Sequence, residues 1–241
     1  MRSLVISDIH GCYEEFCLLL DKVNYCAAED RLILLGDYID RGPNSKQVIE
    51  KVIELVNNDE AIALKGNHDL MLVNWLKQPE ESMEWYFRNG GFETVKSLVE
   101  TAGMPINFDS ACTWSKQIKN GYQKQLEFLE QLPLYYEDEK HIFVHAGIQP
   151  FLDDWKETTA HDLIWIRDTF LENKHKQEKS VVHGHTPNQL LHGVDDIYFG
   201  DMKIGIDGGC AFGFQLNCLE ISSDGYRSYY VESKRKPDID R

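Results

Sequence analysis

Residues 32–42 read Leu-Ile-Leu-Leu-Gly-Asp-Tyr-Ile-Asp-Arg-Gly, an apolar run that ends in a glycine and then in polar residues. The run at 32–35 has the length and composition of a short buried β-strand. Apolar runs followed by polar residues and a nearby glycine also occur at 4–11 and at 61–69. Ligands of open α/β sheets gather beyond the carboxyl ends of the strands. We therefore expect these strands to deliver polar side chains to one functional edge.

Apolar residues at helical spacing separate these strands. They predict helices at 14–23 and from 43 to about 57, and a third helix that begins at Asp69. The order is strand, helix, strand, helix, strand, helix. Such an alternation calls for a largely parallel sheet with helices on its faces.

The pattern changes after about residue 78. We expect a helical insertion at about 78–133, with helices at 94–99 and 123–132. Strands are expected to resume at 141–144 and 180–183, then at 197–199, 203–207, 215–221 and 226–232, with a hairpin turn at 223–225. We expect one domain over 1–232 and a polar, frayed tail at 233–241.

Composition narrows the class of protein. The chain has 241 residues, 42% of them hydrophobic, and a net charge of −15. These values exclude wholesale disorder and argue against a nucleic-acid partner, which needs a basic face. The sequence shows no secretory signal and no run of the ~18–20 apolar residues that a membrane span needs. We expect a cytoplasmic monomer with reduced cysteines and no membrane partner.

Aspartate, asparagine and histidine follow five of the expected strands. The residues are Asp8, His10, Asp37, Asn67, His68, His145 and His185. Oxygen and imidazole ligands without thiolates suit Mn²⁺, Fe or Zn²⁺. One carboxylate has two oxygens, so it can bridge two cations that together clamp a phosphoryl group. The sequence therefore predicts a two-metal centre at the strand ends.

Three segments carry a family resemblance: Asp8-Ile9-His10-Gly11, the stretch 36–42, and Gly66-Asn67-His68-Asp69. They resemble the signature motifs of the phosphoprotein phosphatase family of calcineurin-like metallophosphoesterases, in its bacterial and phage serine/threonine form. His145-Ala146-Gly147 and 183–186 (His-Gly-His-Thr) match in the same order, so the resemblance reaches about residue 209. It implies an α/β fold with two mixed β-sheets packed face to face and flanked by helices.

The resemblance also implies a role for each matching residue. Asp8 and His10 would bind the first metal, Asp37 would bridge, and Asn67, His145 and His185 would bind the second. His68 would act as general acid, oriented by Asp40, while Arg41 and Arg167 would grip the phosphate. Asn67, and Asn89 in an Asn-Gly-Gly loop, are further expected substrate-binding residues. The cofactor would be two divalent ions, Mn²⁺ first, with Fe or Zn²⁺ as alternatives.

The reaction implied is direct attack on phosphorus by a metal-bridging hydroxide, without a phosphoenzyme. The leading substrate is phosphoserine or phosphothreonine in proteins, favoured by Asp40, which dinucleotide hydrolases often replace by alanine. The alternative is symmetrical hydrolysis of a dinucleoside polyphosphate such as diadenosine tetraphosphate, favoured by the stretches 66–70 and 41–45. A non-catalytic metal-binding protein is a different class, but such proteins usually lose a ligand, and here every ligand position is filled.

Two features remain open from sequence. Packing of the Trp85-Tyr86-Phe87 cluster against the sheet is favoured over a wall that stacks on a substrate. His183 either supports a neighbouring ligand or simply ends a strand. We expect four other histidines at the surface: His141, His161, His175 and His192.

Overall fold

A computed structural model describes residues 2–99, 101 and 103–236. Its first sheet has the strand order β10-β9-β1-β2-β3. The strands are β1 (Arg2–Ile6), β2 (Asp30–Leu34), β3 (Ile62–Ala63), β9 (Gln215–Ser222) and β10 (Gly225–Glu232). Strands β1, β2 and β3 are parallel, while β9 is antiparallel to both β1 and β10. The expected parallel core is present and gains an antiparallel hairpin from the end of the chain.

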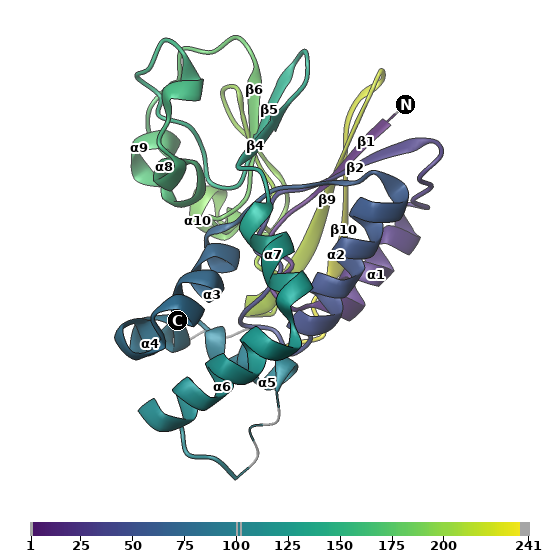
Figure 1. Cartoon of the computed structure of the whole chain (residues 1–241). Coiled ribbons are helices and arrows are strands. Elements are labelled where there is room, and N and C mark those ends of the chain that lie inside the picture. Colours follow the sequence, from purple (N-terminus) through teal and green to yellow (C-terminus); the bar gives the residue numbers. More distant parts are fainter. Residues whose placement is uncertain (1, 100, 102, 237–241) are drawn as a thin grey trace.

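The second sheet has the order β4-β5-β6-β8-β7. Its strands are β4 (Tyr135–Glu137), β5 (His141–Val144), β6 (Ser180–His183), β7 (Tyr198–Phe199) and β8 (Lys203–Gly205). The three central strands are parallel and the two edge strands are antiparallel to their neighbours. Figure 1 shows the two sheets side by side, with helices outside them. Both sheets are mixed, as predicted.

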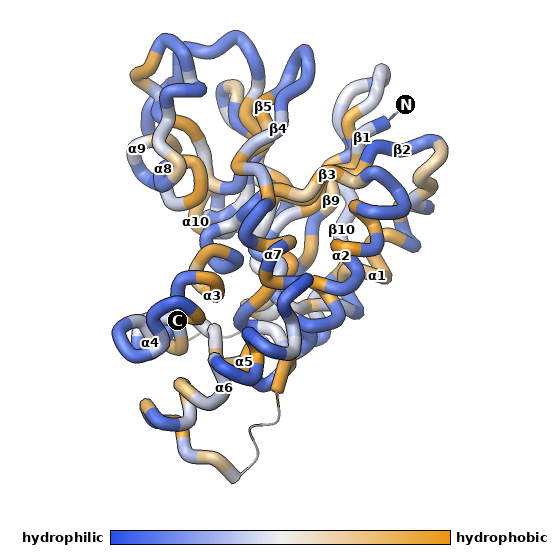
Figure 2. The backbone as a smooth tube through the Cα atoms, in the orientation of Figure 1, coloured by the Kyte–Doolittle hydropathy of each residue, from blue (hydrophilic) through white to orange (hydrophobic). Residues whose placement is uncertain are grey.

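Apolar residues from both sheets meet in one cluster. Val5, Ile33 and Leu35 from the first sheet lie in it with Phe143, Val182 and Ile204 from the second. All are buried, as their β-branched and aromatic composition favours for packed strands. Figure 2 shows orange, hydrophobic stretches along this inner region, whereas the outer loops are blue. The sheets therefore pack face to face, as the resemblance implied.

Helices α1 (Tyr13–Lys22) and α2 (Ser45–Asp59) cover the outer face of the first sheet. Both are amphipathic, and α1 buries Phe16 and Leu19 while α2 buries Val48 and Val52. The next helices follow one another: α3 (Asn67–Lys77), α4 (Pro79–Arg88), α5 (Gly91–Leu98), α6 (Phe108–Gly121) and α7 (Gln123–Gln131). Three short helices lie beside the second sheet: α8 (Ala160–Trp165), α9 (Asp168–Leu171) and α10 (Asn188–His192). No helix among the described residues is long and apolar enough to cross a bilayer.

Some sequence expectations differ from the structure. The third strand is shorter than 61–64, and the edge strand β4 and helices α4, α6, α8, α9 and α10 were not predicted. The expectation that His141 and His175 lie at the surface is wrong, because both are buried. His141 Nε2 lies 2.8 Å from the Tyr226 hydroxyl, and His175 Nε2 lies 3.0 Å from the Met202 carbonyl oxygen. Hydrogen bonds of this kind allow a histidine to be buried.

The expected frayed tail is also partly wrong. The Ser233 amide donates to the Phe214 carbonyl at 2.7 Å, and the Lys234 amide donates to Glu15 Oε1 at 3.0 Å. These bonds hold the start of the segment against the body of the protein. Residues 237–241 lie outside the described part of the chain.

Candidate metal centre

The predicted ligands lie at the strand ends. Asp8 and His10 follow β1, Asp37 follows β2, and His145 and His185 follow β5 and β6. Backbone φ is between 46° and 70° at six residues of this region: Asp8, His10, Asp37, Asp40, Arg41 and His185. This left-handed conformation is costly for residues other than glycine and concentrates at functional sites. The backbone at the strand ends therefore adopts locally unfavourable conformations, which direct these side chains toward one site.

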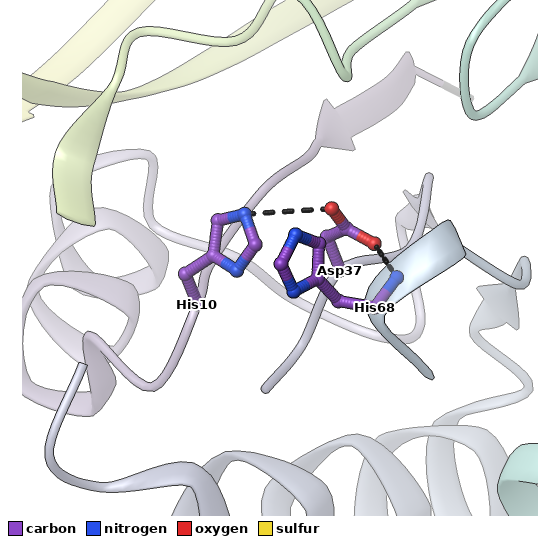
Figure 3. Close-up of side chains that lie close together, drawn as sticks. All are labelled: His10, Asp37 and His68. Carbon is purple, nitrogen blue, oxygen red and sulfur yellow. Dashed lines mark hydrogen bonds and ion pairs between the residues drawn. The ribbon is translucent and has the colours of Figure 1, made fainter. Parts of the chain in front are cut away.

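The Asp37 carboxylate is at the centre of the cluster. Its Oδ2 lies 3.4 Å from His10 Nε2 and 3.5 Å from His145 Nε2. Its Oδ1 accepts a hydrogen bond of 2.9 Å from the His68 backbone amide. Figure 3 shows the His10 ring and the His68 backbone on opposite sides of this carboxylate. Asp37 Oδ2 thus lies close to predicted ligands of both metals, His10 and His145, where a bridging ligand is expected.

Two histidines are oriented by backbone carbonyls. His10 Nδ1 lies 2.7 Å from the Ile39 carbonyl oxygen, and His145 Nδ1 lies 3.0 Å from that of Leu35. These contacts place the ring proton on Nδ1 and leave the Nε2 lone pair facing Asp37. Burial lowers the pKa of both rings, and for His10 the Arg41 guanidinium lowers it further. Both imidazoles are therefore kept neutral, the form that binds a metal.

The donor atoms fall into two groups that share Asp37. One group is His10, Asp37 and His68, the other is Asp37, His145 and His185, and within each the donor atoms lie within 4.8 Å of one another. Asn67 Oδ1 lies 2.9 Å from His145 Nε2, so it adjoins the second group. Nitrogen and oxygen donors without a thiolate fit two divalent cations. Burial and the Asp8 carboxylate raise the pKa of Asp37, which a bound cation would reverse.

Hydrogen bonds from neighbouring residues fix the position of the Asp8 carboxylate. Ser7 Oγ donates to its Oδ2 at 2.6 Å, and the His185 amide donates to Oδ1 and Oδ2 at 3.2 and 3.0 Å. Oδ1 lies 4.0 Å from His10 Nε2. The strand-end segments of the two sheets therefore meet at this carboxylate, which places it beside the first ligand group.

Gly184→Ala is expected to weaken divalent-metal binding about 10- to 100-fold, the range for groups that orient ligands. A Cβ at this position would lie 2.1 Å from both Asp8 Oδ2 and Ser7 Oγ, so the carboxylate must move. Titration calorimetry with Mn²⁺ measures the change. Gly121→Ala is the control, because its Cβ would meet no described atom within 4 Å. Equal Mn²⁺ affinities for the two variants would contradict the prediction.

Two arginines face the ligand groups. Arg41 donates from Nη1 to His10 Nε2 at 2.6 Å and from Nη2 to His68 Nε2 at 2.9 Å. Arg167 donates from Nε to His185 Nε2 at 3.0 Å and from Nη2 to the His185 carbonyl at 3.2 Å. Guanidinium forks match the oxygens of phosphate. Both guanidinium groups thus adjoin the predicted metal ligands, and their phosphate-binding role stays a prediction.

His68 is paired with a fully buried aspartate. Its Nδ1 lies 2.7 Å from Asp40 Oδ2. Asp40 Oδ1 accepts hydrogen bonds from the Tyr86 hydroxyl at 2.8 Å and from Thr94 Oγ1 at 2.6 Å. Burial raises the pKa of Asp40 to about 7, while the Thr94 and Tyr86 hydroxyls act in the opposite direction. The carboxylate can therefore orient the His68 ring so that Nε2 faces the site.

Tyr86→Phe is expected to move the acid limb of the kcat/KM profile toward higher pH. Losing a donor to the ionised carboxylate raises the pKa of Asp40 further, so less carboxylate is present at neutral pH. The rate should fall at neutral pH and recover in alkali. A pH–rate profile checks this. Tyr25→Phe is the matched control, since its hydroxyl contacts the remote Asp59 at 3.4 Å; identical profiles for both variants would refute the role.

Two further aspartates shape the site and were not predicted as site residues. Asp69 Oδ2 accepts from the amides of Asp37 at 2.9 Å and Gly66 at 2.8 Å, which fixes the loop after β2. Asp207 is buried beyond β8, where burial and the Asp8 carboxylate raise its pKa. The signal for Asp207 was in the sequence: it precedes two glycines just after an apolar strand. Asp37 likewise lies beside a glycine just after an apolar strand, although there the glycine comes first.

Other predicted residues occupy different places. The Asn89 side chain donates to the Trp85 carbonyl at 2.8 Å, at the end of α4, so its substrate-binding role stays a prediction. His183 is buried, with its ring edge-on to Phe170 at 5.2 Å between centroids, and burial lowers its pKa to about 4. Neither ligand group contains it. It is a packed histidine at a strand end.

The three aromatics at 85–87 divide between two roles. Tyr86 is fully buried and stacks on Trp75 at 5.3 Å, and Phe87 packs against Phe92 at 5.4 Å. The packing role favoured from the sequence is therefore correct for Tyr86 and Phe87. Trp85 is 46% exposed. Its ring lies 5.9 Å from that of Trp165, which in turn lies edge-on to His185 at 5.9 Å. Trp85 and Trp165 thus form an aromatic surface beside His185, which we call the aromatic shelf.

Comparisons with known proteins show which family the chain belongs to. The sequence profile of the Calcineurin-like phosphoesterase family matches residues 1–206. A bis(5'-nucleosyl)-tetraphosphatase PrpE [asymmetrical] from Anoxybacillus flavithermus is 28% identical, over 97% of this chain and 98% of its own length. A symmetrical bis(5'-nucleosyl)-tetraphosphatase from Nitrosospira multiformis is 28% identical, over 81% of this chain and 62% of its own. A crystal structure of a protein provisionally named a diadenosine tetraphosphatase matches with a TM-score of 0.65 and 18% sequence identity. The match covers 96% of this chain and 93% of that protein's chain. The chain belongs to the calcineurin-like phosphoesterase family.

Proposed function

We propose that this protein is a metal-dependent hydrolase of dinucleoside tetraphosphates. The observation that carries the proposal is the aromatic shelf of Trp85 and Trp165 beside His185, which offers a nucleobase a stacking surface next to the phosphate-binding arginines. Base–aromatic stacking is worth about 1–3 kcal/mol per base. The two tetraphosphatase relatives support the same substrate class, and one of them aligns over almost its whole length.

The residues have these roles in the proposed reaction. Asp37, His10, His145 and His185 would hold two divalent cations together with Asp8 and Asn67. When bound, such ions would supply an activated water and would neutralise phosphate charge. Arg41 and Arg167 donate to the oxygens of the phosphoryl group under attack. His68, oriented by Asp40 at 2.7 Å, would give a proton to the oxygen that leaves. Burial and the Arg41 guanidinium lower the pKa of its ring, so that it would be a strong acid once Nε2 is protonated.

The second candidate is the serine/threonine protein phosphatase activity expected from the sequence motifs. The observation in its favour is the intact Asp40–His68 pair, since a departing serine or threonine alkoxide needs a proton far more than a departing phosphate does. The two relatives described above are instead named for a dinucleotide substrate. We therefore place the phosphoester of a small nucleotide first and the phosphoprotein second.

A paired rate assay on the Mn²⁺-loaded protein tests the proposal. It compares kcat/KM for diadenosine tetraphosphate with kcat/KM for a phosphoserine and phosphothreonine peptide. A preference of at least about tenfold for the dinucleotide, about 1.4 kcal/mol of transition-state discrimination, is expected. The reverse preference would favour the protein phosphatase. Products also locate the bond that is cleaved: ADP alone means symmetrical hydrolysis, and ATP with AMP means asymmetrical hydrolysis.

A further inference from the structure

A pocket of about 240 Å³ lies directly beside the metal centre, and Arg41 belongs to both. Three basic residues (Arg41, Arg235 and Lys236) and three phenylalanines (Phe87, Phe92 and Phe212) form most of its lining. The acidic residue in the lining, Glu93, is paired with Lys96 at 2.6 Å. The pocket is therefore cationic in a chain whose net charge is −15.

The two added basic residues come from the segment that follows β10. The Ser233 amide bonds to Phe214 at 2.7 Å and the Lys234 amide bonds to Glu15 at 3.0 Å, so the segment is anchored. Arg235 Nη1 then donates to the Arg41 carbonyl at 2.9 Å. The Arg41 guanidinium itself lies over the Phe212 ring, 4.9 Å from its centroid. The segment 233–236 is thus brought to the residue that faces the metal ligands.

The position of the pocket indicates which part of a substrate would enter it. Arg41 Nη2 contacts His68, the proposed proton donor to the leaving oxygen, at 2.9 Å. Arg41 Nη1 also contacts His10 at 2.6 Å, so the pocket adjoins the side of the centre that carries His10 and His68. In the proposed reaction His68 makes this the leaving-group side. The pocket's volume is below the roughly 300–1,000 Å³ of sites that enclose a whole drug-sized ligand. It suits a portion of a larger anion that is already held at the centre.

We propose that this pocket binds the phosphate groups of the departing nucleotide, with Arg235 and Lys236 as residues that determine specificity for polyphosphate substrates. The inference rests on the proposed function. In the reaction the oxygen of water bonds to the phosphorus at the centre, the bond from that phosphorus to the bridging oxygen breaks, and the leaving phosphate takes a proton from His68. Arg235 and Lys236 balance the negative charge of the leaving phosphates, which a monophosphate ester lacks.

Three variants on one segment test the proposal: Arg235→Ala, Lys236→Ala and, as the matched control, Lys234→Ala. Lys234 carries the same charge but pairs with Glu14 at 2.5 Å, away from this pocket. We expect Lys236→Ala and Arg235→Ala each to raise KM for diadenosine tetraphosphate about tenfold. The KM for p-nitrophenyl phosphate, which brings a single phosphoryl group, should change far less. Lys234→Ala should match the wild type on both substrates.

A second measurement does not depend on dinucleotide turnover. Inorganic tripolyphosphate should inhibit hydrolysis of p-nitrophenyl phosphate competitively, with a Ki raised about tenfold by Lys236→Ala and unchanged by Lys234→Ala. If the wild type fails to hydrolyse diadenosine tetraphosphate, the proposed function is wrong, and tripolyphosphate still reports on the pocket. An equal Ki for the two lysine variants would overturn the proposal that the pocket binds phosphate groups. An equal fall of kcat on both substrates in Arg235→Ala, with KM unchanged, also overturns it, because that pattern shows only support of Arg41.

Discussion

Asp37→Asn should lower kcat/KM on every phosphoester by at least about 10³-fold, some 4 kcal/mol of transition-state stabilisation. Asp37 is the one residue shared by both ligand groups, with Oδ2 at 3.4 and 3.5 Å from His10 and His145. An amide keeps the oxygen that accepts the His68 backbone hydrogen bond but loses the charge and the second oxygen. Steady-state rates at saturating Mn²⁺ measure the loss.

Stability measurements separate this effect from a folding defect. Burial and the Asp8 carboxylate disfavour the ionised Asp37, so a neutral amide should not lower the Tm in the presence of a chelator. Added Mn²⁺ should raise the Tm of the wild type more than that of the variant, because tighter binding gives more stabilisation. Asp162→Asn, on α8 and outside both ligand groups, should keep the rate and the Mn²⁺ response. A rate above about a tenth of the wild type in Asp37→Asn would exclude two-metal activation of water.

His68→Asn should have the next largest effect, about 10²- to 10⁴-fold in kcat for a substrate with a poor leaving group. The reason is that His68, held by Asp40 at 2.7 Å, would supply the proton that a basic leaving oxygen needs. Phenyl phosphate should therefore lose far more rate than p-nitrophenyl phosphate, whose leaving group departs without a proton. The ratio of the two rates is the measurement, and His192→Asn, an exposed histidine on α10, is the control.

The same variant distinguishes two roles for His68, whose ring nitrogen also lies within reach of the first ligand group. If it donates a proton, the variant keeps its full content of bound metal and becomes more sensitive to the leaving group. If it binds a cation, metal content falls and both substrates slow equally. The second result would contradict the proposed acid role. Metal analysis of the purified variant decides between them.

Local sequence patterns predicted the strand ends and the polar residues that follow them. An apolar run followed by aspartate located the ends of β1 and β2, with a glycine between the run and the aspartate only at β2. Both sheets are mixed, as the resemblance implied. The strand ends were predictable because strand length, apolar composition and turn residues are all encoded within a few positions. The short edge strand β4 and helices α8 to α10 were missed, since elements of a few residues carry little periodicity and are stabilised by their neighbours.

The burial of individual polar side chains was less predictable. His141 and His175 look like surface residues by type, yet each is buried with a hydrogen-bond partner distant in sequence, Tyr226 and Met202. Asp207 is a similar case, because its neighbour Asp8 lies near the other end of the chain. A residue's own sequence neighbourhood contains no information about such partners.

Sequence alone thus determined the polar residues that each strand end presents, because a strand and its following turn are specified locally. It also predicted that Asp8 and Asp37, which follow β1 and β2, would lie at one edge, since parallel strands end at a common edge. Only the tertiary structure decided that Trp85 meets Trp165 and that Arg235 reaches Arg41. Those contacts follow from the pairing of β9 with β1 and from helix packing. An alternating pattern specifies which face of a strand is buried, but not which distant segment it will pair with.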